Sequence, residues 1–89
     1  MLNENLLKGM DLYAFRELAN SLNFIYLNYF VELCIYGERK IAYENLCMQI
    51  NEFDIKIHRN FFNYLKSFCL FYNLDESYWK NLEHLISWG

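Results

Sequence analysis

The sequence contains no proline, and its three glycines are isolated at positions 9, 37 and 89. Isolated glycines exclude the glycine-rich loops that hold phosphate groups. Because there are also no low-complexity tracts and no internal repeats, no stretch resembles an interdomain linker. A chain of 89 residues falls within the size of one domain. We therefore expect a single domain over residues 1–89.

Cysteine is scarce and unpaired. The three cysteines, Cys34, Cys47 and Cys69, are odd in number and form no C-x-x-C pair, which argues against a disulfide framework. We expect free thiols that pack in the core as small apolar side chains. The segment MLNENLLKGM lacks the basic stretch and the apolar run of a secretory signal, so the protein is expected to be cytoplasmic.

Long apolar runs and catalytic groups are missing as well. The most apolar stretch, residues 24–36, contains Asn28 and Glu32 and is too short to span a bilayer. The only histidines, His58 and His84, are not spaced with cysteines or acids as metal ligands are. A cysteine paired with a histidine would be the remaining nucleophile, but cysteines in apolar surroundings are typical of cores. The sequence predicts no enzyme, no metal and no cofactor.

Aromatic residues, by contrast, are abundant. Eight Phe, eight Tyr and two Trp make up 20 % of the chain. Each can bury roughly 150–250 Å², which a small domain needs because it removes a limited share of its surface from water. Aromatic side chains that the core cannot hold suit a protein-binding surface, where Tyr and Trp are enriched.

The charge is slightly acidic and unevenly distributed. The net charge is −3, and acids outnumber bases over residues 32–54, whereas residues 55–73 contain Lys56, Arg59 and Lys66 and no acid. An acidic balance disfavours nucleic acid as a partner, because phosphate binding needs a basic surface. A helix-turn-helix nucleic-acid binder that uses these three bases is a minor alternative, since they lie in or just before a mostly aromatic helix.

Apolar residues recur at helical spacing nearly throughout, which predicts an all-α fold, a compact bundle of four to five short helices. The first helix should begin near Asp11 as its N-cap, and the polar residues 20–23 should end it. A second helix over residues 23–36 should end at Gly37. The remaining predicted elements are a helix over residues 38–53, a loop over 54–58, a central helix over 59–72, and a helix that begins at Asp75 as its N-cap.

The third predicted helix carries both a core stripe and a candidate binding face. The expected core stripe is Ala42, Leu46, Ile50 and Phe53. The opposite face should carry Ile41, Glu44 and Met48, flanked by Asn45, Asn51 and Glu52. Apolar anchors interleaved with acids are what a protein partner requires. The alternative is that Ile41 and Met48 pack under the N-terminal segment or another helix.

Two segments of the chain resemble the MafI-type (Maf-island) family of immunity proteins. The first, GERKIAYENLC followed by INEFDI over residues 37–55, is similar to a helix-ending GE and a run close to lALEnLc…l.E.di.i. The second, LDESYWKNLEHL over residues 74–85, is similar to the family's closing pattern gLd..yw..L..L. The likeness extends over roughly residues 24–86. It departs at Arg39 and Lys40, where the family has small or aliphatic residues, and at His58, where a Ser or Thr helix cap is expected.

The resemblance implies an inhibitor that binds another protein. Members of this family neutralise a cognate secreted toxin of a bacterial polymorphic toxin system by binding its C-terminal domain in the cytoplasm, and the toxins are often nucleases, EndoU-like or otherwise ribonuclease-like. A ribonuclease has a basic cleft for its substrate, which an acidic surface can occlude. The residues predicted to contact the toxin are Glu38, Glu44, Glu52 and Asp54, with Tyr43 or Met48 as apolar contacts.

Other interpretations stay open for the sequence. Glu38 can instead stabilise the start of the third helix through the helix dipole. The chain can also be a helical interaction or regulatory adaptor unrelated to toxins, and the gene directly upstream distinguishes the two because an immunity gene follows its toxin gene. Exposed Tyr residues, Ile41 and Met48 would serve a homodimer equally well.

Overall fold

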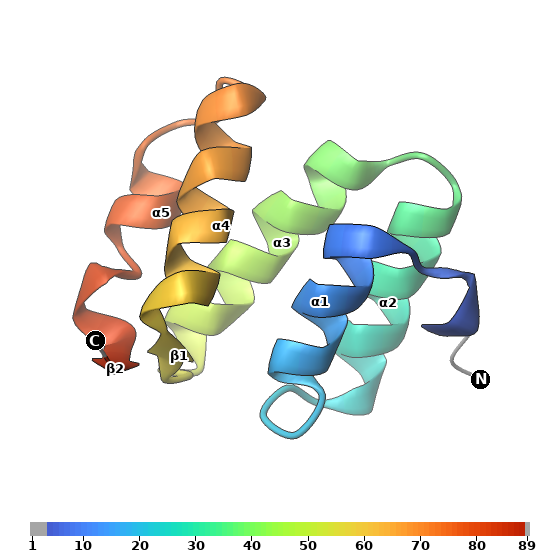
Figure 1. The fold of residues 1–89 in the computed structure, drawn as a ribbon, viewed down its shortest axis with the longest axis horizontal. Helices are drawn as coiled ribbons and strands as arrows, with labels where there is room; N and C mark the ends of the chain where they lie inside the picture. The colour runs from blue at the N-terminus through green and yellow to red at the C-terminus, as the bar shows by residue number, and fades with distance from the viewer. Residues whose placement is uncertain (1–3, 89) are drawn as a thin grey trace. The chain divides into compact units, whose positions relative to one another are not determined.

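Five α-helices make up most of residues 4–88. The computed structural model describes the backbone of residues 4–88 and the side chains of residues 5–87. The elements shown in Figure 1 are, in order, η1 (Glu4–Leu6), α1 (Gly9–Leu18), α2 (Phe24–Ile35), α3 (Arg39–Glu52), β1 (Ile57–His58), α4 (Arg59–Phe71), α5 (Ser77–Lys80), η2 (Glu83–Leu85) and β2 (Ile86–Trp88). The predicted all-α fold class is therefore confirmed.

The chain divides into two compact units, residues 1–42 and residues 43–89. In the first unit, α1 contacts α2, and the two helices are visible side by side in Figure 1. In the second unit, α4 contacts α5 and both strands. The expectation of one domain over the whole chain stays a prediction.

Three helices end in the same hydrogen-bonded motif. The residue after the C-cap has a positive φ in each case: Gly37 (82°), Asp54 (50°) and Asn73 (56°). The next amide then donates to the carbonyl five residues back, as in Ile55 N–H to Ile50 C=O at 3.0 Å after α3. This pattern is the Schellman motif, which satisfies carbonyls that a helix end leaves free. The predicted helix end at Gly37 is confirmed.

The first unit buries one face of α1 against α2. The buried side chains are Ala14, Phe15 and Leu18 of α1 and Leu27, Phe30 and Val31 of α2. The break predicted between the two helices is present, and the Asn23 side chain accepts a hydrogen bond from the Ile25 amide at 2.8 Å as the N-cap of α2. Ala19 is exposed, because α1 ends one residue before it.

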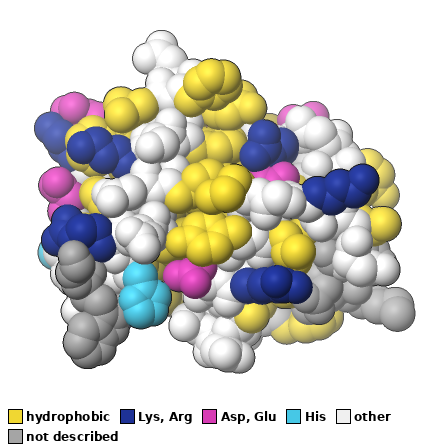
Figure 2. Space-filling model, viewed as in Figure 1, with side chains coloured by type: hydrophobic (Ala, Val, Ile, Leu, Met, Phe, Trp, Pro, Cys, Tyr) yellow, Lys and Arg dark blue, Asp and Glu magenta, His cyan; other side chains and the backbone are white. Residues whose placement is uncertain are grey.

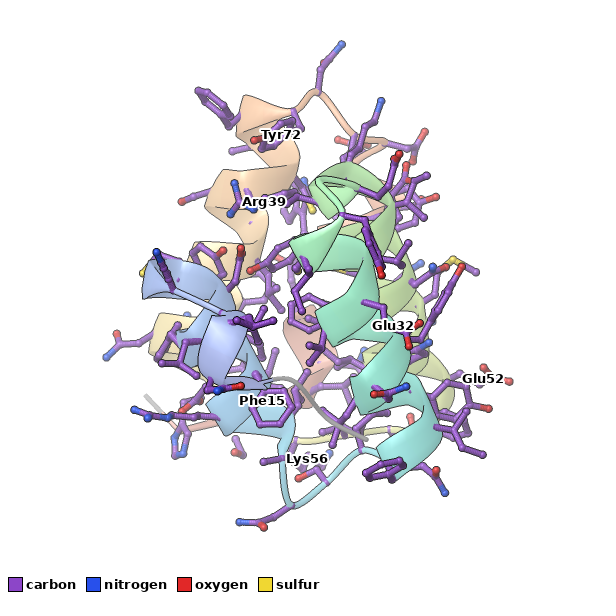
Figure 3. The ribbon with its side chains drawn as sticks, turned by 90° about the vertical axis from the view of Figure 1, so that its right-hand side faces the viewer. Phe15, Glu32, Arg39, Glu52, Lys56 and Tyr72 are labelled. Atoms are coloured by element: carbon purple, nitrogen blue, oxygen red, sulfur yellow. The ribbon has the colours of Figure 1, made fainter. Side chains whose placement is uncertain are left out.

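Asp11 does not cap the first helix, which corrects the prediction. The helix α1 begins at Gly9, so Asp11 lies in its first turn. The Asp11 carboxylate accepts hydrogen bonds from Arg39 Nε at 3.2 and 3.0 Å and from Arg39 Nη2 at 2.9 Å. This bidentate ion pair, whose Arg39 is labelled in Figure 3, joins the first turn of α1 to the first turn of α3 within one unit.

The second unit has an aromatic core around α4. The helix buries Phe61, Phe62, Leu65, Phe68 and Cys69, while Tyr72, which follows it, is half-buried. Leu46 and Ile50 of α3 are buried in this unit as expected, and Ala42, the last residue of the first unit, is buried as well. Phe53 was expected on the same stripe, but it is exposed, because α3 ends at Glu52 and the backbone turns away at the Schellman motif.

Two short strands replace parts of the predicted loop and last helix. Ile57 and Ile86 are partners in a parallel pairing of β1 with β2, with an irregularity between Ile57 and His58. Ile57 is buried, and β-branched residues favour this extended conformation. The fold class is unaffected, since the strands have two and three residues.

The last helix is shorter than predicted. It begins at Ser77 and ends after one turn, and Trp79, Leu82 and Leu85 of this segment are buried. The N-cap residue is Glu76 and not the predicted Asp75, but the Asp75 Oδ1 accepts a hydrogen bond from the Ser77 amide at 2.9 Å. Hydrogen bonding to Ser77 lowers the Asp75 pKa.

No helix within residues 4–88 combines the length and the apolar character that crossing a membrane requires.

Candidate protein-binding site

The described residues expose many large apolar side chains. Twelve of them are at least one-third exposed, and Figure 2 shows such side chains, in yellow, beside charged ones on the face turned to the viewer. Exposed apolar groups rimmed by charge are typical of protein-binding surfaces. A binding site is expected where exposed apolar side chains share a surface with the predicted acids.

Met48 is an exposed apolar residue that lies among those acids. Its side chain is 55 % exposed. It lies four residues after Glu44 and four before Glu52, a spacing that places the three on one side of α3. Glu52 is exposed, Glu44 is partly exposed, and Figure 3 shows the Glu52 side chain pointing away from the ribbon. The structure thus brings these three predicted residues together.

A small pocket adjoins Met48. Its volume is about 100 Å³, and it is lined by Cys47, Met48 and Asn51 of α3 and by Ser77, Tyr78 and Asn81 in and directly after α5. Small-molecule sites have roughly 300–1,000 Å³, so this pocket is too small for a cofactor and suits one side chain of a partner. The side chains of Asn51, Ser77, Tyr78 and Asn81 give it hydrogen-bonding groups. We call Glu44, Met48, Glu52, Asp54 and the lining residues of this pocket the α3–α5 surface.

The negative charge of Glu44 acts on Tyr78, a residue that lines this pocket. Burial and, next in size, the negative charge of Glu44 raise the pKa of Tyr78. The tyrosine therefore keeps its proton and can donate a hydrogen bond. A partner group at this position meets an acidic carboxylate and a neutral hydroxyl.

Two acids at the end of α3 lie where the helix disfavours them. The C-terminal end of a helix carries a partial negative charge, yet Glu52 is the last residue of α3 and Asp54 follows two residues later, and the last turn has no basic residue. Asp54 also has a φ of 50°, a conformation that glycine adopts at lower cost. Within the described side chains, neither carboxylate has a hydrogen bond or an ion pair that would compensate.

Tyr43 does not belong to this surface, which corrects the prediction. Its side chain is completely buried, its hydroxyl accepts a hydrogen bond from the Tyr64 hydroxyl at 2.7 Å, and its ring stacks on Phe68 at 4.0 Å. A side chain without exposed surface cannot contact a partner. Tyr43 instead joins α3 to α4.

Glu38 and Ile41 belong to the other unit, and both are exposed. The Glu38 carbonyl accepts a hydrogen bond from the Ala42 amide at 3.0 Å, so Glu38 directly precedes α3. An acid at this end of a helix is favourable. The structural interpretation of Glu38 therefore has a physical basis, and its contact with a partner stays a prediction.

The thiol of Cys47 lines the pocket, and that of Cys69 lies next to it. Cys47 and Cys69 are buried and free, and a hydrogen bond between them raises the Cys47 pKa, with burial as the second cause, and lowers the Cys69 pKa. Free thiols in apolar surroundings agree with the sequence-based expectation. No group of three potential metal ligands occurs among the described residues.

Sequence reasoning missed Ser77, Tyr78 and Asn81. The signal that could have found them is Asp75, because its side chain accepts a hydrogen bond from the amide of Ser77, the first residue of this short helix. What the sequence did not indicate is that α5 lies beside the second half of α3. Comparison with family models, curated proteins and solved structures finds no match for this chain. The MafI-type assignment therefore stays a prediction.

Proposed function

We propose that this chain is an immunity protein that binds the C-terminal domain of a cognate secreted toxin, a nuclease with a basic cleft, and blocks that cleft with its α3–α5 surface. The proposal combines the resemblance over residues 37–55 and 74–85 with the arrangement of the acids on α3. An interaction adaptor unrelated to toxins would use the same surface, so the experiment below begins with the identity of the partner.

The observation that carries the proposal is the unfavourable placement of Glu52 and Asp54. Each acid opposes the dipole of α3 at a cost of about 0.3–1 kcal/mol, and Asp54 additionally occupies a left-handed conformation. Residues whose local placement costs stability, with no contact in the folded chain that offsets the cost, are expected at functional sites. A cationic partner would supply the compensation that the folded chain lacks.

The pocket gives this acidic surface an anchor point. A lysine or arginine of the toxin can place its aliphatic stem against Met48 and its charged end near Glu44, within reach of the hydrogen-bonding groups of Ser77 and Tyr78. Side chains that enter a pocket at the centre of an interface supply much of the binding energy. The surrounding acids would speed association through electrostatic attraction.

The experiment measures binding to the C-terminal domain of the protein encoded directly upstream of this chain. Dissociation constants and nuclease inhibition are determined for the wild type, Glu44→Lys, Glu52→Lys and Met48→Ala. We expect each variant to weaken binding by roughly tenfold or more, as for central interface residues, and we expect the charge reversals to act mainly on the association rate.

Glu83→Lys is the matched control, because Glu83 is an exposed acid of the same unit outside the α3–α5 surface. It should bind as the wild type does. Wild-type affinity in both charge-reversal variants, with helical content retained, would contradict the assignment of the surface. No binding by the wild type itself would contradict the immunity function.

A further inference from the structure

The helix α2 has an apolar side that the rest of its own unit leaves exposed. Phe24, Ile25, Tyr29 and Tyr36 are 54, 72, 47 and 79 % exposed. Ile25, Tyr29, Glu32 and Tyr36 follow the spacing i, i+4, i+7 and i+11, which places them along one side of a helix. We call Phe24, Ile25, Asn28, Tyr29, Glu32 and Tyr36 the α2 surface; Figure 3 labels Glu32 on it.

The composition of the α2 surface restricts what can cover it. Glu32 is the only charged residue of α2. A helix that lies on a membrane carries Lys and Arg on its polar side, and α2 has none. A basic nuclease cleft would require more acids than one. A mostly apolar surface with a single charge fits a partner of the same composition.

The order of residues along α2 is self-complementary. In an antiparallel pair of helices centred between residues 30 and 31, Ile25 lies opposite Tyr36 of the second copy, and Tyr29 lies opposite Glu32. The Tyr29 hydroxyl can then donate a hydrogen bond to the Glu32 carboxylate, a charge-assisted bond that occurs twice because of the symmetry. Antiparallel pairing also places opposite ends of the two helix dipoles together.

We propose that the α2 surface binds the α2 surface of a second copy of this chain, antiparallel about a two-fold axis. Its four apolar side chains expose on the order of 450 Å² per copy, given roughly 200 Å² for an aromatic side chain. When Asn28, Glu32 and neighbouring atoms are added, the total area buried by the two copies approaches the lower end of the range of about 1,200–2,000 Å² that specific interfaces bury. An interface at this end of the size range is typical of weak association, so the dimer should form only as the protein concentration rises. This pairing does not depend on the identity of the toxin.

The test uses two charged variants of the full-length chain in sedimentation equilibrium. Ile25→Glu adds an acid near the N-terminus of α2, and Tyr36→Lys adds a base at its C-terminus; both charges favour the helix. We expect the wild type to shift from monomer to dimer as concentration rises. Each variant alone should raise the dissociation constant at least about tenfold, because each half of the interface loses one apolar contact and buries an unpaired charge.

Mixing the two variants tests the register. In the antiparallel pair, the carboxylate introduced at position 25 of one copy faces the ammonium group introduced at position 36 of the other. The native Tyr36 and Ile25 face each other in the second half of the same pair, so the mixture should dimerise again. Phe71→Glu is the control, since Phe71 is a similarly exposed aromatic residue on α4, and it should dimerise as the wild type does.

Three outcomes would overturn the proposal. The first is a wild type that stays monomeric at every concentration, including one that instead binds phospholipid vesicles or only a foreign protein. The second is equal loss of the dimer in Phe71→Glu and in the α2 variants. The third is a mixture of Ile25→Glu and Tyr36→Lys that stays monomeric, because the two positions would then not face each other.

Discussion

The Tyr64 hydroxyl donates a hydrogen bond to the Tyr43 hydroxyl at 2.7 Å, which links α4 to α3 inside the second unit. The two rings meet edge to face, with centroids 5.8 Å apart, and both lie near Phe68. Tyr43 is completely buried, whereas Tyr64 is partly exposed. The pair thus fixes the position of α3, the helix that presents the acidic residues of the α3–α5 surface.

Tyr43→Phe should lower the free energy of unfolding by about 0.5–1.5 kcal/mol, because it removes a hydrogen bond and keeps the ring. Urea unfolding measures this change. The double variant Tyr43→Phe/Tyr64→Phe should lose less than the sum of the two single variants, since both remove the same bond. Toxin affinity should not change. A substantial loss of affinity in Tyr43→Phe, without loss of stability, would restore Tyr43 as a contact residue.

Asp54→Gly should stabilise the protein and weaken its binding. Glycine relieves the left-handed backbone at φ 50° and removes an acid from the C-terminal end of α3, so we expect a gain of about 0.5–1 kcal/mol in the free energy of unfolding. Thermal and urea unfolding give the stability, and calorimetry gives the affinity for the upstream-encoded toxin domain.

Asn73→Gly is the control for Asp54→Gly, because Asn73 occupies the same position after α4 with a φ of 56°. It should also stabilise the chain but leave binding unchanged. If Asp54→Gly stabilised the chain and bound the toxin as tightly as the wild type, the strained acid would have no role in recognition.

Helical periodicity was enough to predict the fold class and the cores of α3 and α4, because a buried face leaves a repeating apolar signal. Helix ends were harder. Gly37 was recognisable as a helix end, but the equivalent motif at Asp54 uses a residue that sequence rules place in many conformations. Periodicity had placed Phe53 in the core, but α3 ends before this residue and the chain turns away, so Phe53 is exposed.

The candidate site was predictable on α3 and not on α5. Glu44, Met48 and Glu52 lie on one helix, so spacing alone places them together. Ser77, Tyr78 and Asn81 join them through tertiary contacts, which leave no signal in the spacing. Tyr43 shows the opposite difficulty: a tyrosine has a polar group that suits a surface, and only the partner hydroxyl of Tyr64 allows it to be buried.

Arg39 is a departure from the MafI-type pattern that acquires a structural role through Asp11. Arg39→Lys should lower the free energy of unfolding by about 1 kcal/mol, since lysine cannot form the bidentate pair and the site is partly exposed. Lys40→Arg, at the exposed neighbouring position, should change stability by less than about 0.5 kcal/mol. If the two substitutions changed the free energy of unfolding equally, the bidentate geometry of the Arg39–Asp11 pair would contribute nothing to stability.

Cys34 should make the stability of the chain depend on alkaline pH. Burial, followed by the charge of Asp11 and opposed by Arg39, raises the Cys34 pKa to about 12. In the unfolded chain the thiol ionises near pH 9. Between these two values the unfolded state binds fewer protons than the folded state, so the free energy of unfolding falls as pH rises. Below the pKa of the unfolded chain the contribution of the neutral thiol is fully present.

We would measure urea unfolding of the wild type and of Cys34→Ser at about pH 8 and pH 11, on either side of the thiol's ordinary pKa. Both chains contain the same tyrosines, so the difference between them gives the contribution of Cys34 to the pH dependence of stability. The loss of stability on going to the higher pH should be larger in the wild type than in Cys34→Ser. The native Cys34 thiol should also react slowly with a disulfide reagent at the lower pH, because the thiolate is the reacting form. The same loss of stability in both chains, together with rapid modification of Cys34 at the lower pH, would mean that this thiol ionises at its ordinary pH in the folded protein.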